Sequence, residues 1–285
     1  MLNFNVGGVP EYFNRPWHQA RENGSFAQRG LEVTWKDYPG GTGAMMHDLR
    51  EGVIDVAVAL TEGVVAEIIN RRSCRIAQWF VTSPLRWGVH VAASSPYQQI
   101  ADLQNRTFAV SRLGSGSHLM AYVLAQHHSW SPERLHFEIV NNLDGARQAL
   151  AQEAADGFLW EQFTTQPWVD AGEFRRVGVI DTPWPCFVVA VRNSRSDEGL
   201  SLLLDTVNQS AAQLKARPGA AAEVARQYAL PIARPEPWWE GVRWATDQRV
   251  ERATLEQVMA TLAELKVVPG AIDPEELCWD GCEVR

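Results

Sequence analysis

The sequence of 285 residues has little of what a membrane protein or a nucleic-acid-binding protein needs. Its apolar stretches, among them residues 53–60 and 187–191, are far shorter than the ~20 residues of a membrane-spanning helix, and these two have the length of buried strands. Its 26 Lys and Arg residues are outnumbered by 34 Asp and Glu residues and form no basic run, whereas phosphate binding draws on a concentrated basic face. We therefore expect neither a membrane span nor a nucleic acid partner.

Cysteine is also scarce, and the cysteines form no recognisable metal or disulfide pattern. Four thiols are too few for a disulfide framework in a chain of this length. Cys278 and Cys282 could form a local bridge, although thiols that are reduced or loosely oxidised are the interpretation that compartment rules favour. The sequence lacks H-E-x-x-H, C-x-x-C and any His–acid cluster at ligand spacing, so we expect no metal and no cofactor. The other two cysteines are Cys74 and Cys186.

The N-terminus lacks the marks of a secretory signal peptide. No cationic segment is followed by an apolar core and a small-residue cleavage site, and residues 2–6 alternate in polarity like a strand. We therefore expect a cytoplasmic protein as the chain is written, and a periplasmic one if a signal peptide has been removed. The composition, 46% hydrophobic and 21% charged, is that of a soluble globular chain, which we expect to be a monomer.

Short apolar runs alternate with helical stretches from residue 2 to about residue 191. This alternation is typical of β-α-β units that build a parallel sheet, so the predicted fold class is α/β. After the N-terminal strand, the expected strands lie at residues 31–38, 54–60, 75–81, 88–93, 106–110, 136–140, 157–160, 175–180 and 186–191. One helix is expected from the Gly-rich turn at residues 40–43 through residue 50, and a short one just before residue 103. Others are expected at residues 62–70, 118–127 and 143–152. After residue 193 only helices are expected, at 200–216, 220–228 and 254–265.

The second of two such α/β series is inserted into the first, which implies two lobes. Lobe I is predicted to comprise residues 1–87 and 188–285, with a helical C-terminal tail, and lobe II residues 88–187. Two crossing strands would join the lobes, and a cleft would lie between them. Because parallel sheets bind ligands beyond the carboxyl ends of their strands, the residues that follow each strand are the informative ones.

Five segments carry a resemblance to a known protein family, namely residues 26–33, 38–41, 49–57, 101–103 and 114–117. In them the chain resembles the type II periplasmic-binding-protein fold, and within it the substrate-binding proteins for taurine, aliphatic sulfonates and thiamine-pyrimidine precursors. The resemblance implies two lobes, each a mainly parallel sheet flanked by helices, that close on a small-molecule ligand by hinge bending. Typical members serve importers, so the resemblance leaves a transporter or protein partner open.

Further motifs narrow this resemblance to a subgroup. Residues 41–45, 61–63, 83–87 and 111–117 are similar to leaderless members found in fungi and bacteria, for which the resemblance implies a cytosolic location.

A Gly-rich turn between a strand and a helix is the best candidate for binding an anion or a polar ligand. The backbone N–H groups and hydroxyls of Ser115, Gly116 and Ser117 can point at an oxyanion at the positive end of the helix. The alternative is a turn whose Ser only caps the helix. Gly41 and Thr42 repeat the arrangement in the other lobe, with the same two interpretations.

Carboxylates and one guanidinium follow other strands. Glu62, next to Thr61 at the end of an apolar strand, could accept hydrogen bonds from a ligand amine, amide or ring N–H, or could compensate the helix dipole. Glu161, after the strand that ends in Trp160, offers a similar carboxylate. Arg86 is expected to lock the strand crossing through bidentate bonds, with pairing to an acid or an anionic ligand as the alternative.

Among twelve tryptophans, Trp160 and Trp184 fall where a flat ligand ring could stack, and Trp17, in a loop near Glu11, could add a wall. A Gly-x-Ser-x-Gly nucleophile turn is absent, so we assign no catalytic residue. The candidate ligand-binding residues are Glu11, Gly41, Thr42, Thr61, Glu62, Ser83, Ser115, Gly116, Ser117, Trp160, Glu161 and Trp184.

Three functions fit these residues. The first is binding of a small polar or heteroaromatic molecule, anionic, sulfonate-like or pyrimidine-like. The second is a cytosolic enzyme on the same scaffold, a lyase or a pyrimidine-precursor synthase, with Glu62 or Glu161 as general base. The similar fungal thiamine-pyrimidine synthases use iron and a cysteine-rich segment, and this chain lacks the cysteine cluster. The third is a sensor that docks through the tail from Pro231 to Arg285, where Trp238, Trp239 and Trp244 form an exposed patch or pack back onto the first lobe.

Overall fold

The computed structural model describes residues 1–196, 198–230 and 237–285, so the start of the predicted docking tail, Pro231 to Pro235 and the residue after it, lies outside the described residues. The chain divides into two compact units. Unit 1 contains Met1–Ser83, Trp184–Tyr228 and residues 237–285, and unit 2 contains Pro84–Pro183 with the short stretch after Tyr228. Among the described helices, none is both long and apolar enough to cross a lipid bilayer.

Unit 1 is built on a five-stranded sheet in the order β2-β1-β3-β10-β4. Strands β1, β2 and β3 pair in parallel, while β10 is antiparallel to both of its neighbours. Four strands therefore run in one direction and β10 runs against them, which confirms a mainly parallel sheet. The strands are β1 (Leu2–Gly8), β2 (Leu31–Asp37), β3 (Val56–Leu60), β4 (Cys74–Val81) and β10 (Phe187–Arg192).

Burial along the strands explains why their sequences differ. The interior strands β3 and β10 read VAVAL and FVVAVR and are almost wholly buried, because both of their faces are covered. The edge strand β2 alternates between buried or half-buried and exposed positions over most of its length. The continuous apolar run at residues 56–60, within the predicted strand 54–60, was therefore a reliable signal for an interior strand.

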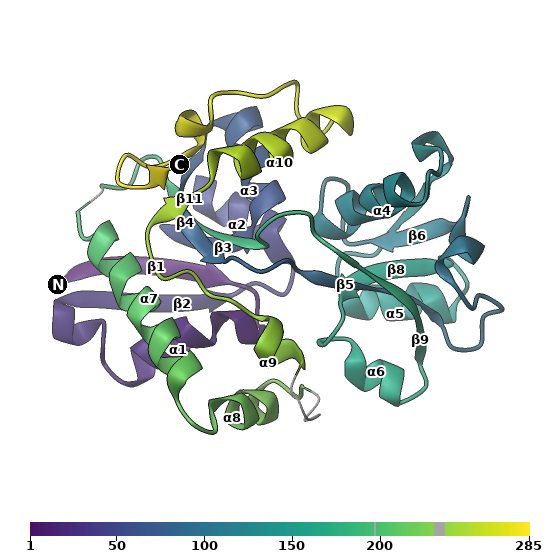
Figure 1. Cartoon of the computed structure of the whole chain (residues 1–285), viewed down its shortest axis with the longest axis horizontal. Helices are drawn as coiled ribbons and strands as arrows, with labels where there is room; N and C mark the ends of the chain where they lie inside the picture. The colour runs from purple at the N-terminus through teal and green to yellow at the C-terminus, as the bar shows by residue number, and fades with distance from the viewer. Residues whose placement is uncertain (197, 231–236) are drawn as a thin grey trace. The chain divides into compact units, whose positions relative to one another are not determined.

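Helices cover both faces of the unit 1 sheet, as Figure 1 shows. Helix α1 packs on α7 along one face, while α2 and α3 contact β3 on the other and α10 packs on α3. The helices of the unit are α1 (Arg15–Glu22), α2 (Gly41–Arg50), α3 (Thr61–Arg71), α7 (Leu200–Ala216), α8 (Ala220–Gln227), α9 (Pro237–Gly241) and α10 (Arg252–Glu264).

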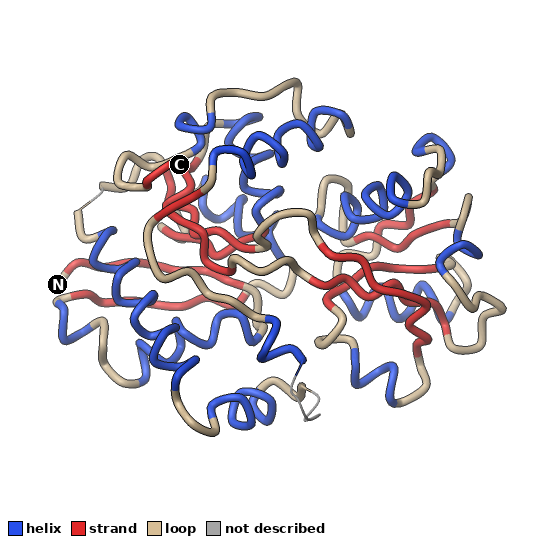
Figure 2. The backbone as a smooth tube through the Cα atoms, in the orientation of Figure 1, coloured by secondary structure: helices blue, strands red, loops and turns tan. Residues whose placement is uncertain are grey.

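Unit 2 repeats this plan with a five-stranded sheet in the order β7-β6-β8-β5-β9. Strand β5 is antiparallel to both neighbours, and the other four strands share one direction. Figure 2 shows helices against both faces of its strands. The elements are β5 (Arg86–Ala92), β6 (Thr107–Val110), α4 (Gly116–His127), β7 (His136–Ile139), α5 (Leu143–Ala151), β8 (Gly157–Glu161), α6 (Gln166–Asp170) and β9 (Phe174–Asp181).

Short elements complete the fold. The two-residue strands β11 (Arg249–Val250) and β12 (Glu283–Val284) pair in parallel, so the prediction of helices alone after residue 193 was wrong. Two residues are too few to produce a strand-like alternation in the sequence. The 3-10 helices are η1 (Tyr12–Asn14), η2 (Ala27–Arg29), η3 (Ile100–Leu103), η4 (Pro132–Arg134) and η5 (Pro274–Leu277).

Two aromatic predictions need correction. Trp17 lies in helix α1, not in a loop, and is completely buried among aromatic rings, so it is not a ligand wall. Its ring neighbours are Phe26, Trp35 and Phe80. In the C-terminal segment Trp238 and Trp244 are buried, and the Trp244 Nε1–H donates to the Phe13 carbonyl oxygen over 2.8 Å. Trp238 and Trp244 therefore pack back onto unit 1, which was the second of the two interpretations, and do not form an exposed docking patch.

Candidate functional site

The predicted residues of unit 1 gather at one edge of its sheet. Strands β1 to β4 end at this edge, and the antiparallel strand β10 begins there. The residues in the loops and helix starts that follow or precede these strand ends are Glu11, Gly41, Thr42, Thr61, Glu62, Ser83 and Trp184. The edge is therefore where the fold concentrates polar side chains in unit 1.

Three buried hydroxyls at this edge bind backbone groups of neighbouring segments. Thr42 Oγ1 accepts a hydrogen bond from the Leu60 N–H over 3.1 Å, and the Thr61 hydroxyl donates to the Pro185 carbonyl oxygen over 2.5 Å. Ser83 Oγ accepts from the backbone N–H of Arg243 over 3.2 Å. These hydroxyls tie the ends of β3, β4 and β10 to adjacent segments.

Thr42 also limits the size of the residue at position 63, which packs against its side chain. A Cβ at Gly63 would lie 2.6 Å from Thr42 Cγ2, which is closer than two carbon atoms can pack. We expect Gly63→Ala to lower the free energy of unfolding by about 1–3 kcal/mol because of this overpacking. Thr42→Ser removes the offending carbon and keeps the hydroxyl bond.

A double-mutant cycle by urea unfolding measures this contact. In the Thr42→Ser background the alanine at position 63 is expected to cost much less, since the next Thr42 atom would lie 3.4 Å away. An equal cost of Gly63→Ala in both backgrounds would contradict the contact.

Glu62 and Trp184 form a buried pair. Glu62 stands in the first turn of α3 and is 2% exposed, and its Oε2 accepts a hydrogen bond from the Trp184 Nε1–H over 3.0 Å. Within the described part of the chain, Glu62 Oε1 is buried and has no hydrogen-bond partner. Burial raises the pKa of Glu62 to about 7, against smaller lowering contributions from its own backbone N–H and from Trp184. Glu62 thus has a pKa near neutrality and one carboxyl oxygen, Oε1, that is available to a hydrogen-bond donor.

The remaining two unit 1 candidates sit at the starts of helical segments. Glu11 precedes η1, and its carbonyl oxygen accepts from the Asn14 N–H over 3.1 Å. Gly41 opens α2 with a φ of +67°, a left-handed conformation that favours glycine.

In unit 2 the Gly-rich turn runs from β6 to α4 and is held by a chain of hydroxyls. Ser115 is the N-cap of α4, and its Oγ accepts from the His118 N–H over 3.3 Å. Ser117 Oγ lies 3.0 Å from Ser115 Oγ and accepts from the Ser111 N–H, also over 3.0 Å. Both hydroxyls therefore form hydrogen bonds within the turn. The first backbone N–H groups of α4, at Gly116 and Ser117, have no intrahelical partner and remain as donors for a ligand.

Arg112 was not predicted as a site residue from the sequence, although it lies within the motif at residues 111–117. Its side chain is half-buried and, among the residues that the structure describes, forms no hydrogen bond or ion pair. Burial lowers the pKa of Arg112, as expected for a cation withdrawn from water without a counter-charge. The turn therefore combines an uncompensated guanidinium with the positive end of a twelve-residue helix. The usable signal was that Arg112 is the single basic residue of residues 111–117.

The other unit 2 candidates lie at the end of β8. Glu161 is buried, and its carboxylate accepts from the N–H groups of Phe163 and Thr164 and from the Thr164 hydroxyl at 2.7–3.1 Å. Burial raises the pKa of Glu161, and these bonds oppose the rise. Both carboxylate oxygens are therefore occupied within their own turn. Trp160 is half-buried and packs against the hydrophobic core of the unit.

Arg86 does not form the predicted bidentate lock. Its Nε lies 3.5 Å from Asp181 Oδ1 on the neighbouring strand β9, and both side chains are about half exposed. A single exposed contact of this kind contributes at most about 1 kcal/mol. Within residues 1–196, 198–230 and 237–285, no three His, Cys, Asp or Glu side chains are close enough together to hold a metal ion.

Comparison with known proteins identifies the fold of this chain. The family model described as Ca3427-like PBP matches residues 87–180. The structure of the CA3427 gene product of Candida albicans, described as having the generic periplasmic binding protein fold, matches with a TM-score of 0.88 and 21% identity over 100% of this chain and 98% of that one. The chain has the periplasmic-binding-protein fold. No curated protein sequence matches it significantly.

Two further structures with this periplasmic-binding-protein fold are informative. The alkanesulfonate-binding protein SsuA of Xanthomonas axonopodis pv. citri, bound to MOPS, has a TM-score of 0.81 and 18% identity over 98% of each chain. PhnD1 of Prochlorococcus marinus, in complex with methylphosphonate, has a TM-score of 0.65 and 9% identity over 93% of this chain and 99% of that one. Structural similarity therefore extends through the C-terminal segment, beyond the five segments that carry the sequence resemblance.

Proposed function

We propose that this chain binds a small molecule that carries an organic oxyanion, a sulfonate or a phosphonate, at the turn formed by residues 111–117. The observation that carries the proposal is the half-buried Arg112 guanidinium, which has no counter-charge among the described residues and stands in the turn that opens α4. A guanidinium makes short, charge-assisted and often bidentate bonds to oxyanions. The N–H groups at the start of a helix favour the same ligand charge.

The relatives support this ligand class. SsuA was solved with MOPS, whose charged group is a sulfonate, and PhnD1 was solved with methylphosphonate. Both ligands present several oxygens on one tetrahedral centre next to an organic group, which suits recognition by a guanidinium and several N–H donors together.

Glu62 supplies a second kind of contact in this proposal. Its unpartnered Oε1 would accept a hydrogen bond from an amine, amide or ring N–H of a ligand. Trp184 fixes the orientation of the carboxyl group through the other oxygen. The proposal includes closure on the ligand by bending where the chain crosses between the units.

Native mass spectrometry of freshly purified protein, followed by calorimetric titration, tests the binding function. We expect saturable binding of one ligand per chain by MOPS, other aminosulfonates or methylphosphonate, with higher thermal stability as mass action requires. Pyrimidines and free amino acids serve as comparison ligands. A response to these alone would contradict the oxyanion class, and no response to any of them would contradict the binding function.

A second candidate function is an enzyme that uses Glu62 as general acid or base. It is favoured by one observation, namely a buried carboxyl group with a pKa of about 7 and one unpartnered oxygen. Mass spectrometry of ligand recovered after incubation separates the two functions. Conversion that is lost in a Glu62→Gln variant still able to bind would support the enzyme, whereas unchanged ligand supports the binding protein.

A further inference from the structure

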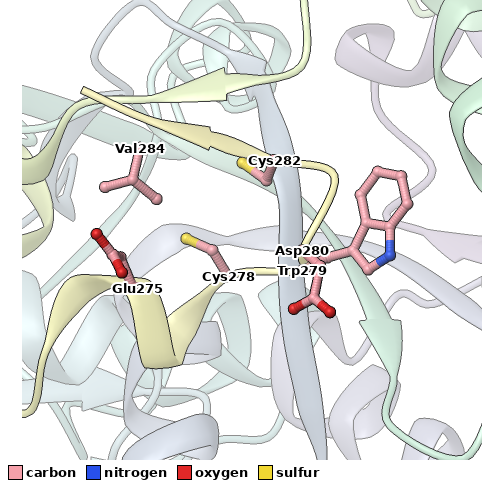
Figure 3. Close-up of a pocket in the computed structure, with 6 residues that line it drawn as sticks. All are labelled: Glu275, Cys278, Trp279, Asp280, Cys282 and Val284. Atoms are coloured by element: carbon pink, nitrogen blue, oxygen red, sulfur yellow. The ribbon is translucent and has the colours of Figure 1, made fainter.

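A cavity of about 360 Å³ in the C-terminal segment of unit 1 is lined by two cysteines. Figure 3 shows the sulfur atoms of Cys278 and Cys282 pointing into the space bounded by Glu275 and Val284, with Asp280 and Trp279 on the connecting turn. Both cysteines are free thiols, and each residue is 7–8% exposed. The cavity is far in sequence from residues 111–117 and is independent of the proposed function.

The fold holds these two thiols together through backbone bonds on both sides of the turn. The Trp279 N–H donates to the Ile76 carbonyl oxygen of β4 over 2.9 Å, which fixes the chain beside Cys278. The Cys282 N–H donates to the Trp279 carbonyl oxygen over 2.8 Å and closes the turn. The next residue, Glu283, begins β12. As a result the two thiols face the same cavity.

We propose that Cys278 and Cys282 form a thiol–disulfide exchange site for small, positively charged disulfides. Two thiols that line one cavity match what such exchange needs, namely space for a small disulfide and a second sulfur near the first.

The surroundings of Cys282 assign the roles within this proposal. The neighbouring Cys278 thiol, together with burial and the charges of Glu251 and Glu283, raises the pKa of Cys282 far above its ordinary value. Cys282 is therefore the poorer first nucleophile. Cys278 acts as the attacking sulfur and Cys282 as the resolving one.

The exchange balances in two steps. The Cys278 thiolate attacks one sulfur of the disulfide R–S–S–R, forms a Cys278–S–R bond and releases RS⁻, which takes up a proton. The Cys282 sulfur then gives up its proton, attacks Cys278 Sγ, forms the Cys278–Cys282 bond and releases the second RS⁻, which is protonated in turn. The small disulfide is reduced to two thiols, and the protein dithiol is oxidised by two electrons.

Acidic groups around the cavity select the charge of the disulfide. Glu275 and Asp280 line it, and the charges of Glu251 and Glu283 act on Cys282. Arg252 pairs with Glu275 at 2.9 Å, and Arg285 and Arg249 pair with Glu283 at 2.6 and 3.7 Å. Arg252 also pairs with Asp273 and Arg249 with Asp247, so the acidic groups outnumber the arginines and the surroundings keep a net negative charge that attracts cations.

The test treats the reduced full-length protein with cystamine, a cationic disulfide, and with the anionic oxidised glutathione, each followed by intact-mass and peptide mass spectrometry. We expect cystamine to remove two hydrogen atoms from the protein and to place the bond between Cys278 and Cys282, leaving Cys74 and Cys186 reduced. At low ionic strength its rate should exceed that of oxidised glutathione roughly tenfold, with the difference shrinking in salt.

Two serine variants separate the roles and guard against a folding artefact. Cys282→Ser should stop at a mixed disulfide on Cys278, whereas Cys278→Ser should leave Cys282 unmodified, with circular dichroism spectra like the wild type for both. Asp280→Asn should narrow the difference between the two disulfides. Absence of exchange, equal rates for both reagents at low salt, or binding of Ag⁺ by the dithiol without any disulfide exchange would each overturn the proposal.

Discussion

Replacing Arg112 by Gln is expected to weaken binding of a sulfonate or phosphonate roughly 30- to 150-fold. Loss of the charge-assisted hydrogen bonds from a guanidinium costs about 2–3 kcal/mol, and each 1.4 kcal/mol is a tenfold change in Kd. The free protein should be no less stable than the wild type, because the variant removes a half-buried charge that has no counter-charge among the described residues. Calorimetric titration with MOPS gives the Kd, and thermal unfolding gives the stability.

Two variants control this prediction. Arg134→Gln changes an exposed arginine of η4 in the same unit and should leave the Kd unchanged. Arg112→Lys keeps the charge but loses the planar fork, so it should bind with an intermediate Kd. An Arg112→Gln protein with wild-type affinity would show that the oxyanion does not contact this side chain.

Glu62→Gln is expected to abolish a large part of the pH dependence of stability. Burial raises the pKa of Glu62 from 4.5 to about 7 on folding. Between these pH values the folded state binds more protons at Glu62 than the unfolded state does. The contribution of Glu62 to the free energy of unfolding is therefore greatest below pH 4.5 and falls as the pH rises toward 7. At about 1.4 kcal/mol per pKa unit the loss is on the order of 3 kcal/mol. The Gln side chain cannot ionise and does not contribute this loss.

Urea unfolding of both proteins at pH 5 and pH 8 measures the effect. The difference between the two profiles isolates Glu62, because His18, His90 and His118, whose pKa values are lowered by burial, titrate in both proteins. Glu240→Gln, at an exposed position on α9, should follow the wild-type profile. Parallel profiles for the wild type and Glu62→Gln would contradict the raised pKa.

From the sequence, the Gly-rich turn at residues 114–117 was preferred to the similar turn at Gly41 and Thr42, and the surroundings of the two turns differ. In unit 1 the Thr42 hydroxyl is bound to the backbone of β3, and its methyl group fills the space opposite Gly63. In unit 2 the hydroxyls of Ser115 and Ser117 are also engaged, but Arg112 beside them has no partner among the described residues. The difference is one unpaired cation, which favours unit 2 for the proposed oxyanion contact.

Much of the fold was predictable because its signals are local. The apolar residues 56–60 indicated an interior strand, predicted at 54–60, and the turn at residues 114–117 indicated a helix start, predicted at 118. Both predictions lie within two residues of the observed bounds of β3 and α4. Helix α1 was missed, although Pro16 in its first turn was a usable signal. Strands of two residues, such as β11, carry no periodicity that could be detected.

The candidate site was less predictable because its contacts are long-range. Residues after strand ends could be named from the α/β pattern alone. The bond between Glu62 and Trp184 joins positions 122 residues apart, and no local pattern indicates it. Likewise, Arg112 is unusual only because its surroundings supply no carboxylate, which is a property of the folded chain.

Amide hydrogen exchange at the start of α4, with and without saturating MOPS, tests the central claim most directly. The N–H groups of Gly116 and Ser117 have no intrahelical partner, so a bound oxyanion should slow their exchange at least about tenfold. The His118 N–H, already bonded to Ser115, should change less. Slowed exchange at Gly116 and Ser117 is the predicted result, and binding of MOPS that leaves both amides unchanged would contradict the account.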